Sequence, residues 1–317
     1  MKKTFKFLIG FVIGGICLYY SFRNFDLNTL KNAICEAAYF YLIPFVFLYL
    51  LNQALRTYRW RIFLSPLANI TAVSLLPVLL FGFFMNTILP ARGGEFVRAY
   101  LIQRRFNLNS VSAFGSIIAE RISDLIGLFA LVMFCSPILP LYKLPIKDFG
   151  FVLLIGIAFV SGAFLFQKFF IKKVKTENKI LVFIMNLLTR AIEGFQILKS
   201  FKKIILVIGF SLMIWINEAL IVFFVARFMH LDLTVLHSTA VIVGLSIGVM
   251  IPGAPGFIGT YEFFGKQMLE FLGYPSAQSL NFVLVLHFLQ IIAVSSAGVI
   301  SFFYLKRQAS QVLSRWN

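Results

Sequence analysis

Three ionisable side chains lie in the middle of an apolar run, where such groups are most costly. Glu120, Arg121 and Asp124 interrupt a segment that is apolar on both sides for the depth of a bilayer. A charge at the centre of a membrane helix costs about 2.5 kcal/mol or more, so these groups mark a substrate or ion site by default. Glu120 and Asp124 are four residues apart and share one helix face. We interpret the three as part of a binding site; the alternative is a structural ion-pair cluster that joins helices.

Two breaks in apolar sequence carry the remaining candidate residues. The first break holds Asn86, Pro90, Arg92, Gly94, Glu95 and Arg98, and the second holds Pro252, Pro255, Gly256, Gly259 and Glu262. An arginine has a planar fork that suits a phosphate, and a helix beginning near Phe257 would direct backbone N–H groups toward an anion. For the first group the alternative is a solvated loop with ordinary charges. Glu262 would pair with an amine or carry a coupling proton, or it complements the helix dipole as a first-turn glutamate.

The composition places these residues in a membrane protein. Of the 317 residues, 60% are hydrophobic before glycine is counted and only 13% are charged. Soluble domains have about 45–50% apolar residues, glycine included, and about 25% charged residues. A soluble domain cannot bury so much apolar surface, which excludes a cytosolic enzyme, a secreted disulfide scaffold and a disordered chain. The net charge of +17 is typical of positive cytoplasmic loops that meet anionic lipid headgroups, and we expect no nucleic acid partner.

The apolar runs predict an all-α polytopic membrane protein with about six to eight transmembrane helices, in a single domain over residues 1–317. Six full spans are expected at residues 5–22, 37–55, 112–139, 151–170, 204–228 and 280–305. The first is similar to a signal peptide, but Tyr19, Tyr20 and Phe22 stand where a cleavage site needs small residues. The basic residues at the span ends place both termini in the cytoplasm.

The distribution of positive charges predicts that the segment 72–90 is a re-entrant hairpin, which enters the membrane from the cytoplasm and returns to it. A full span would export the four arginines between residues 92 and 105, against the rule that positive loops stay inside. Pro77, Gly82 and Pro90 are expected to break the helix. A second re-entrant element, at residues 235–251 and 260–272, is expected to enter from outside.

The two broken segments predict an internal duplication. Each has an apolar approach, a Pro/Gly break and then a glycine shortly before a glutamate, and each lies between two long spans. The two units, about 37–139 and 204–305, would cross the membrane in opposite directions, which is the pattern of inverted repeats with a transport site at the midplane. The alternative is two unrelated loops rich in Gly and Pro. Glu218 and Asn217, in mid-span, are further candidates for lining the same cavity.

The other patterns predict no chemistry of their own. Gly244-Leu245-Ser246-Ile247-Gly248 fits a nucleophile motif, but small residues for close helix packing explain it better within an apolar helical run. The three cysteines and three histidines are dispersed without ligand spacing, and no P-loop or dinucleotide motif occurs, so we expect no metal, cofactor or catalytic residue. Residues 171–203 form a predicted basic cytoplasmic loop, whose segment 180–201 has the periodicity of an interfacial amphipathic helix.

Three motifs together resemble a known family. They are Asn86…Leu89-Pro90-x-Arg92-x-Gly94-Glu95-x-x-Arg98, Glu120-Arg121-x-x-Asp124 and Pro252-x-x-Pro255-Gly256-x-x-Gly259-x-x-Glu262. In this order they resemble the lysylphosphatidylglycerol synthase transmembrane family, which includes the flippase half of the bacterial multiple peptide resistance factor. The resemblance implies a multi-pass protein of a bacterial plasma membrane. The chain stops at Asn317, soon after the last expected span, so we expect a stand-alone member without the synthase domain, for which a lysyltransferase activity would be doubtful.

The resemblance implies lipid transport. The flippase half moves aminoacylated phosphatidylglycerol to the outer leaflet, and other stand-alone members handle polyprenyl-linked sugars. We therefore expect a phospholipid flippase in which Arg92, Arg98 and Arg121 contact the phosphate. Glu95, Asp124 and Glu262 are expected to contact an amine or carry coupling protons. The alternatives are a flippase for polyprenyl-phosphate sugars, an intramembrane transferase with Glu120 and Asp124 as its acid/base pair, and a membrane partner of a separate synthase. Homo-oligomerisation also remains open.

Overall fold

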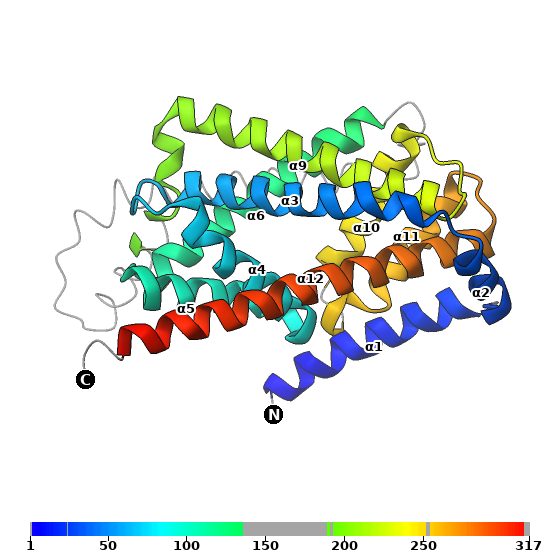
Figure 1. Ribbon diagram of the computed structural model, residues 1–317, viewed down its shortest axis with the longest axis horizontal. Coiled ribbons are helices and arrows are strands. Elements are labelled where there is room, and N and C mark those ends of the chain that lie inside the picture. The colour runs from blue at the N-terminus through cyan, green and yellow to red at the C-terminus, as the bar shows by residue number, and fades with distance from the viewer. Residues whose placement is uncertain (1, 24, 136–188, 191–192, 252–253, 314–317) are drawn as a thin grey trace.

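The computed structural model describes the chain except for residues 1, 24, 136–188, 191–192, 252–253 and 314–317 (Figure 1). The described part holds ten α-helices and no strand, which confirms the predicted all-α fold. The helices are α1 (Lys2–Phe22), α2 (Leu27–Cys35), α3 (Leu42–Leu64), α4 (Ala72–Ile88), α5 (Gly94–Phe106), α6 (Ser110–Phe134), α9 (Phe201–Phe228), α10 (Val235–Met250), α11 (Thr260–Phe271) and α12 (Ser276–Leu313). Short 3-10 helices are η1 (Tyr39–Tyr41), η2 (Pro90–Arg92), η5 (Gln196–Lys199) and η6 (Pro255–Phe257). The predicted span 151–170 and residues 171–188 and 191–192 of the predicted loop 171–203 lie outside the described residues, and with them about half of its amphipathic segment 180–201. The described remainder of that segment includes η5.

Two helices of the described part are long and apolar enough to cross a membrane. They are α9 and the stretch Ser276–Gln308 of α12. Helix α2 and the helix Tyr39–Leu64 pass the same test together but are bent by 81° at their junction. Both α9 and α12 coincide with predicted spans.

Helix α3 runs further than the predicted span 37–55. It ends at Leu64, so Arg56, Arg59 and Arg61, which follow the predicted end, are residues of the helix. The prediction failed here because Arg59 is fully buried and is neutralised by carboxylates of α6, which the local sequence does not reveal. Helix α2, which was not predicted, precedes the bend into α3.

Each broken segment folds as a helical hairpin whose tip lies inside the molecule (Figure 1). Helices α4 and α5 form the first hairpin around η2, and α10 and α11 form the second around η6. The first helix of each hairpin stops at a residue that precedes proline: ψ is 135° at Leu89 and 129° at Ile251. A following proline disfavours the helical region for these residues, so the sequence sets where both tips begin.

Glycines set how closely the hairpin helices approach. A Cβ on Gly94 would collide with the carbonyl oxygen of Gly82, so the backbones of α4 and α5 are in contact there. Neither Gly82 nor Pro77 breaks α4, contrary to the prediction, because Gly82 serves this contact and Pro77 lies in the early turns of a continuous helix. In the second hairpin Gly244 and Gly248 lie against α11, which confirms their assignment to close helix packing.

The two predicted units run in opposite directions along the long axis of the molecule (Figure 1). In the first unit, α3 runs leftward and α6 rightward, and the α4–α5 hairpin enters from the left. In the second unit, α9 runs rightward and α12 leftward, and the α10–α11 hairpin enters from the right. Helices α3 and α9 contact each other, α12 lies along α4, and α6 contacts α10. In the first unit α3 contacts α4, α4 contacts α5, and α6 contacts both α5 and α3. In the second unit α9 contacts α10, α10 contacts α11, and α12 contacts both α11 and α9.

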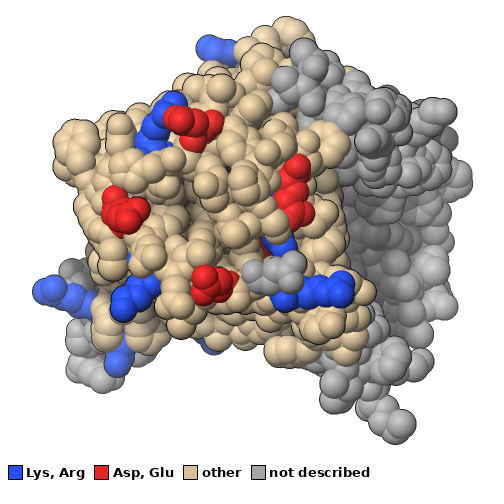
Figure 2. Space-filling view, turned by 90° about the vertical axis from the view of Figure 1, so that its right-hand side faces the viewer, with Lys and Arg blue, Asp and Glu red and all other residues tan. Residues whose placement is uncertain are grey.

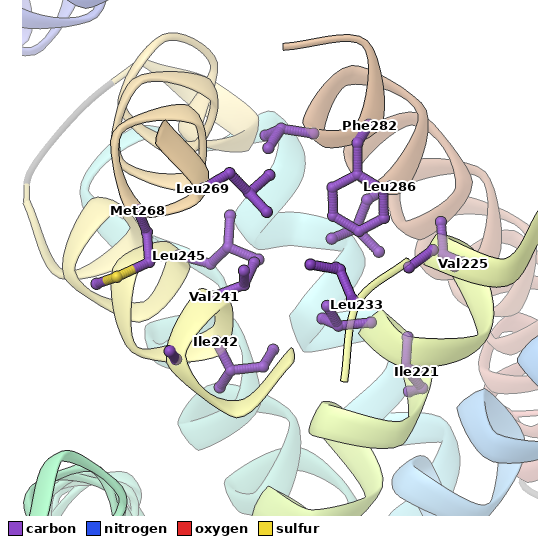
Figure 3. Close-up of a cluster of buried hydrophobic side chains, with 14 of the residues drawn as sticks. Ile221, Val225, Leu233, Val241, Ile242, Leu245, Met268, Leu269, Phe282 and Leu286 are labelled. Atoms are coloured by element: carbon purple, nitrogen blue, oxygen red, sulfur yellow. The ribbon is translucent and has the colours of Figure 1, made fainter. Parts of the chain in front are cut away.

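Each hairpin has a hydrophobic core of its own. The core of the second hairpin joins α9 to α12 and includes Ile221, Val241, Leu269 and Leu286 (Figure 3). The core of the first joins α3 to α6 and centres on side chains such as Trp60, Leu75, Ile102 and Ile117. The separate cores hold the two tips as rigid supports, and the polar residues gather between them.

Candidate functional site

A cavity of about 450 Å³ lies where the two hairpin tips meet α3 and α9. Its wall is largely apolar, with aromatic side chains such as Phe45, Tyr49, Trp215 and Phe257. The polar residues that line it are Asn52, Gln53, Arg56, Asn86, Thr87, Arg92, Glu95, Arg121, Asp124, Glu218, Ser246, Tyr261, His287 and Gln290. The cavity therefore collects ionisable groups from segments that are far apart in the sequence.

One side of the cavity rests on a fully buried ion-pair centre. Glu120 receives Arg98 at 2.9 Å on one carboxylate oxygen and Arg59 at 3.4 Å on the other. Arg59 also contacts Asp124 at 2.7 Å, and the guanidinium of Arg98 lies 4.0 Å from the ring centroid of Trp60. Arg59, Arg98 and Glu120 are 0% exposed, so they orient the residues of the cavity wall and do not line it.

Arg121 extends this centre to the surface of the cavity. Its guanidinium contacts Glu95 at 3.2 Å, Glu120 at 3.2 Å and Asp124 at 3.0 Å. The side chain is 27% exposed, and Glu95 and Asp124 are 15% and 17% exposed. The pairing of Arg121 with residues of its own helix and with Glu95 of α5 joins the first hairpin to α6.

Arg92 connects the two hairpin tips. It donates from Nη2 to the carbonyl oxygen of Val249 at 2.9 Å, and its guanidinium lies 5.9 Å from the ring centroid of Phe257. Its backbone has a φ of 56°, a left-handed conformation that non-glycine residues rarely adopt. Its carboxylate contact in the described part is Glu95, at 3.9 Å.

The charges on this side of the cavity do not balance. We define the arginine–carboxylate cluster as Arg59, Arg92, Arg98, Arg121, Glu95, Glu120 and Asp124. Its four arginines face three carboxylates, which leaves one positive charge. Because the contact of Arg92 with a carboxylate is the longest of these, Arg92 carries the excess charge, and it faces the cavity.

The opposite wall carries a balanced pair and polar groups with free hydrogen-bonding capacity. Arg56 contacts Glu218 at 2.8 Å and donates to Asn52 at 2.6 Å. Four buried polar atoms of residues that line the cavity have no hydrogen-bond partner within the described protein: Gln53 Oε1, Asn86 Oδ1, Arg121 Nε and Trp215 Nε1. Buried polar groups are normally paired, so these atoms have hydrogen-bonding capacity that the described residues do not use.

The second tip is held by Glu262 and His287. The helix that was expected to begin near Phe257 begins at Thr260, and Glu262 Oε2 accepts the Gly259 N–H at 2.7 Å. The carboxylate of the helix itself therefore caps this N-terminus, as in the alternative reading of Glu262 as a first-turn glutamate, and the anion site expected there stays a prediction. Glu262 Oε1 lies 2.5 Å from His287 Nδ1, and His287 faces the cavity.

The predicted site residues come together, in three layers. The cavity wall includes Asn86, Arg92, Glu95, Arg121, Asp124 and Gly256. Arg98 and Glu120 lie behind it, and Glu262 reaches it through His287. Pro90, Gly94, Pro255 and Gly259 form the backbone of the tips, and Pro252 lies outside the described residues. Among the described residues no group of three His, Cys, Asp or Glu side chains has the arrangement to hold a metal ion.

Sequence reasoning missed Arg56, Arg59 and His287. Asn52, Arg56 and Arg59 follow one another at spacings of four and three, which places them on one face of α3 and was a usable signal. His287 and Gln290 are three residues apart in the most apolar part of α12, which is the same kind of signal.

Comparison with known proteins agrees with this architecture. A family model described as the lysylphosphatidylglycerol synthase TM region matches residues 7–298. A UPF0104 membrane protein of Methanothermobacter thermautotrophicus is 24% identical over 99% of both chains. A UPF0104 membrane protein of Methanocaldococcus jannaschii is 20% identical over 71% of this chain and 95% of its own length. No solved structure matches the chain. The chain is therefore an integral membrane protein that belongs to the family of the lysylphosphatidylglycerol synthase transmembrane region.

Proposed function

We propose that the protein translocates a phosphate-bearing lipid headgroup across the membrane through the cavity between the hairpin tips. The observation that carries this proposal is the excess positive charge of the arginine–carboxylate cluster, which Arg92 presents to the cavity. A phosphate supplies the missing negative charge, and a guanidinium can bind it through two parallel N–H bonds. Intramembrane ionisable groups that face a cavity mark substrate pathways by default.

The dimensions and the lining of the cavity support a headgroup as the ligand. Sites for small molecules occupy about 300–1,000 Å³, so a cavity of about 450 Å³ accommodates one headgroup but not two acyl chains. The acyl chains would stay in the bilayer while the headgroup occupies the cavity. No covalent chemistry is required for this path.

The opposed hairpins support alternating access. If the units are inverted repeats, the second unit mirrors the first across the midplane, and exchange of their conformations opens the cavity first to one side and then to the other. Arg92 and Val249 join the tips directly. A phosphate that binds Arg92 competes with the Val249 carbonyl, so substrate binding and release of the tip contact become one event.

The charges at the two ends of the molecule support an orientation. The C-terminal ends of α3, α5 and α12 and the start of α9 lie at the left end in Figure 1. In the described part of the chain, these segments and the residues next to them carry Arg61, Arg104, Arg105, Lys199, Lys202, Lys203, Lys306 and Arg307, with Glu193 as an acidic residue. The right end, which faces the viewer in Figure 2, shows acidic and basic side chains together. The described segments at that end carry Arg23, Asp26, Lys31, Glu36, Arg227, Asp232, Lys266 and Glu270. The basic end would be cytoplasmic by the positive-inside rule.

The substrate class follows from the other groups on the wall. Aminoacylated phosphatidylglycerol carries an amine, for which Glu95, Asp124 and Glu218 offer carboxylates at the cavity. A second candidate, a polyprenyl-phosphate sugar, is favoured by the unpaired Gln53, Asn86 and Trp215 atoms, which suit sugar hydroxyls. The transferase alternative is disfavoured, because Glu120 is fully buried between arginines and cannot exchange protons with a substrate.

The test is lipid translocation in proteoliposomes. Headgroup-labelled phosphatidylglycerol and lysyl-phosphatidylglycerol would be compared with a phosphate-free glycolipid, each against protein-free vesicles. We expect translocation of at least one phosphate-bearing lipid and none of the phosphate-free lipid. Equal translocation of all three lipids contradicts phosphate recognition. A phosphate-free lipid that moves alone contradicts the proposal as a whole.

A further inference from the structure

His287 bridges α12 and the second hairpin tip at the wall of the cavity. Its Nδ1 lies 2.5 Å from Glu262 Oε1, and its Nε2 lies 2.9 Å from the carbonyl oxygen of Gly256. The residue is 6% exposed, and its ring stacks on Tyr261 with 4.1 Å between the ring centroids. Both ring nitrogens therefore face oxygen atoms at hydrogen-bond distance.

The number of protons at this site follows from the geometry. A neutral imidazole has one N–H, which can serve one oxygen but leaves a lone pair facing the other. An imidazolium donates to both oxygens. A protonated Glu262 that donates to a neutral His287 contains the same number of protons. This geometry therefore fits a pair that holds one proton more than a neutral histidine beside a carboxylate.

Loss of that proton acts on the tip of the second hairpin. Glu262 is fixed by the Gly259 N–H at 2.7 Å, so the contact between His287 and Gly256 is the one that can give way. Phe257, which follows Gly256, has a φ of 62°, a left-handed conformation that is strained for a non-glycine residue and that surrounding contacts must hold. Phe257 in turn lies under Arg92 of the first tip.

We propose that the Glu262–His287 pair is a proton-binding site that couples a transmembrane proton gradient to headgroup translocation. This inference rests on the proposed function and adds its driving force. The pair takes up one proton while the cavity is open to one side, which fastens the tip, and releases it to the other side when the tip loosens. One proton would move for each lipid.

Most charged groups of the described residues around the pair are engaged with other partners. Tyr261 and Lys266 lie on the same helix as Glu262, and Lys266 is held by the Ser21 carbonyl oxygen at 3.1 Å and by Glu270 at 3.7 Å. The charged residues that line the same cavity are Arg56, Arg92, Glu95, Arg121, Asp124 and Glu218. Glu218 and Arg56 neutralise each other at 2.8 Å. Helix α4 has no charged residue, and His237 of α10 lies at the far end of that helix, bonded to Tyr274. Helix α2 meets α12 further along, through Thr29 and Asn281.

The first arm of the test measures lipid distribution under a pH gradient. Proteoliposomes with headgroup-labelled phosphatidylglycerol would be given a gradient of about one pH unit, and the ratio of lipid in the two leaflets would be measured at steady state. Coupling of one proton per lipid shifts this ratio about tenfold for the wild type. His287→Gln, whose amide keeps hydrogen-bonding groups but has no basic ring nitrogen, should lose this shift. His237→Gln is the matched histidine control and should keep the shift.

The two proposals fail differently in this arm. Translocation by the wild type with no dependence on the gradient overturns the coupling and leaves the proposed function standing. Absence of translocation of every tested lipid overturns the proposed function. Protein-free vesicles give the passive response of phosphatidylglycerol to the gradient, which is subtracted.

A second arm needs no lipid substrate. Ser246 lines the cavity, so a Ser246→Cys variant free of the native cysteines reports on access to it by a water-soluble maleimide. The labelling rate of Cys at position 246 would be measured in two proteins, one with His287 and one with His287→Gln. The reactivity of the thiol itself depends on pH in the same way in both proteins, so this dependence cancels in the ratio of the two rates. This ratio should change several-fold between about pH 5 and pH 8. A constant ratio overturns the inference whatever the lipid arm shows.

Discussion

Glu120 is the residue on which the ion-pair centre depends. It receives three arginines, from α3, α5 and α6, and it is fully buried. Buried charges are tolerated only when each is compensated, because desolvation costs several kcal/mol for each ion. The centre therefore joins three helices, and removal of any one member leaves a buried charge without its partner.

Replacement of this carboxylate should destabilise the protein strongly. We expect Glu120→Gln to lower the free energy of unfolding by about 3–5 kcal/mol, because Arg59 and Arg98 then lack their partner in a buried site. Unfolding by denaturant in detergent micelles measures this. The matched control is Glu218→Gln. The Glu218 carboxylate is 18% exposed and meets a single arginine at 2.8 Å, so this variant should lose less unfolding free energy. If Glu120→Gln and the wild type unfold at the same denaturant concentration, the ion-pair centre does not stabilise the protein as described.

At the scale of elements, the hairpins depend on glycines that let helix backbones touch. Gly94 lies against the Gly82 carbonyl oxygen and Asn86 at the start of α5. The contact sets the position of η2, and with it the direction of Arg92. The position of Arg92 at the cavity therefore depends on the close packing of α4 against α5.

A methyl group at this contact should separate the helices. We expect Gly94→Ala to cost about 1–3 kcal/mol of unfolding free energy, as overpacking does in other cores. Gly15→Ala in α1 is the control, since no atom lies within 4 Å of the Cβ it would add. That variant should unfold no more easily than the wild type. If the two alanine variants unfold alike, the backbone contact does not support the hairpin.

The sequence predicted the elements better than their ends. The prolines after Leu89 and Ile251 placed both tips, because the restriction they impose is local. The true end of α3 was missed, because Arg59 is acceptable inside a helix only through Glu120 and Asp124, more than sixty positions away. The residues of the three motifs gather at one cavity or directly behind it, but His287 belongs to no motif and is defined by its contacts alone.

At the scale of the whole molecule, the difference in charge between the ends predicts an orientation. The end with α2 should face away from the cytoplasm, and the end with Lys306 should face it. Cys35 is a free, exposed cysteine of α2 and serves as a natural probe.

Labelling of intact cells with an impermeant maleimide tests this orientation. Cys35 should react in intact cells, and Cys35→Ser should abolish the signal. A Cys35→Ser/Lys306→Cys variant should react only after the cells are permeabilised. The reverse pattern would place the basic end outside and contradict the orientation.

The central claim is that a lipid phosphate crosses the membrane at Arg92. The most direct measurement is the rate of phosphatidylglycerol translocation in proteoliposomes with Arg92→Gln and, as a control of equal charge change, Arg104→Gln. Arg104 lies at the basic end, where it is exposed and bonds Tyr100. A charge-assisted hydrogen bond contributes about 1.5–3 kcal/mol, so Arg92→Gln should lose about tenfold or more of the rate. Arg104→Gln should transport as the wild type does. An Arg92→Gln protein that folds and translocates the lipid at the wild-type rate would contradict the account.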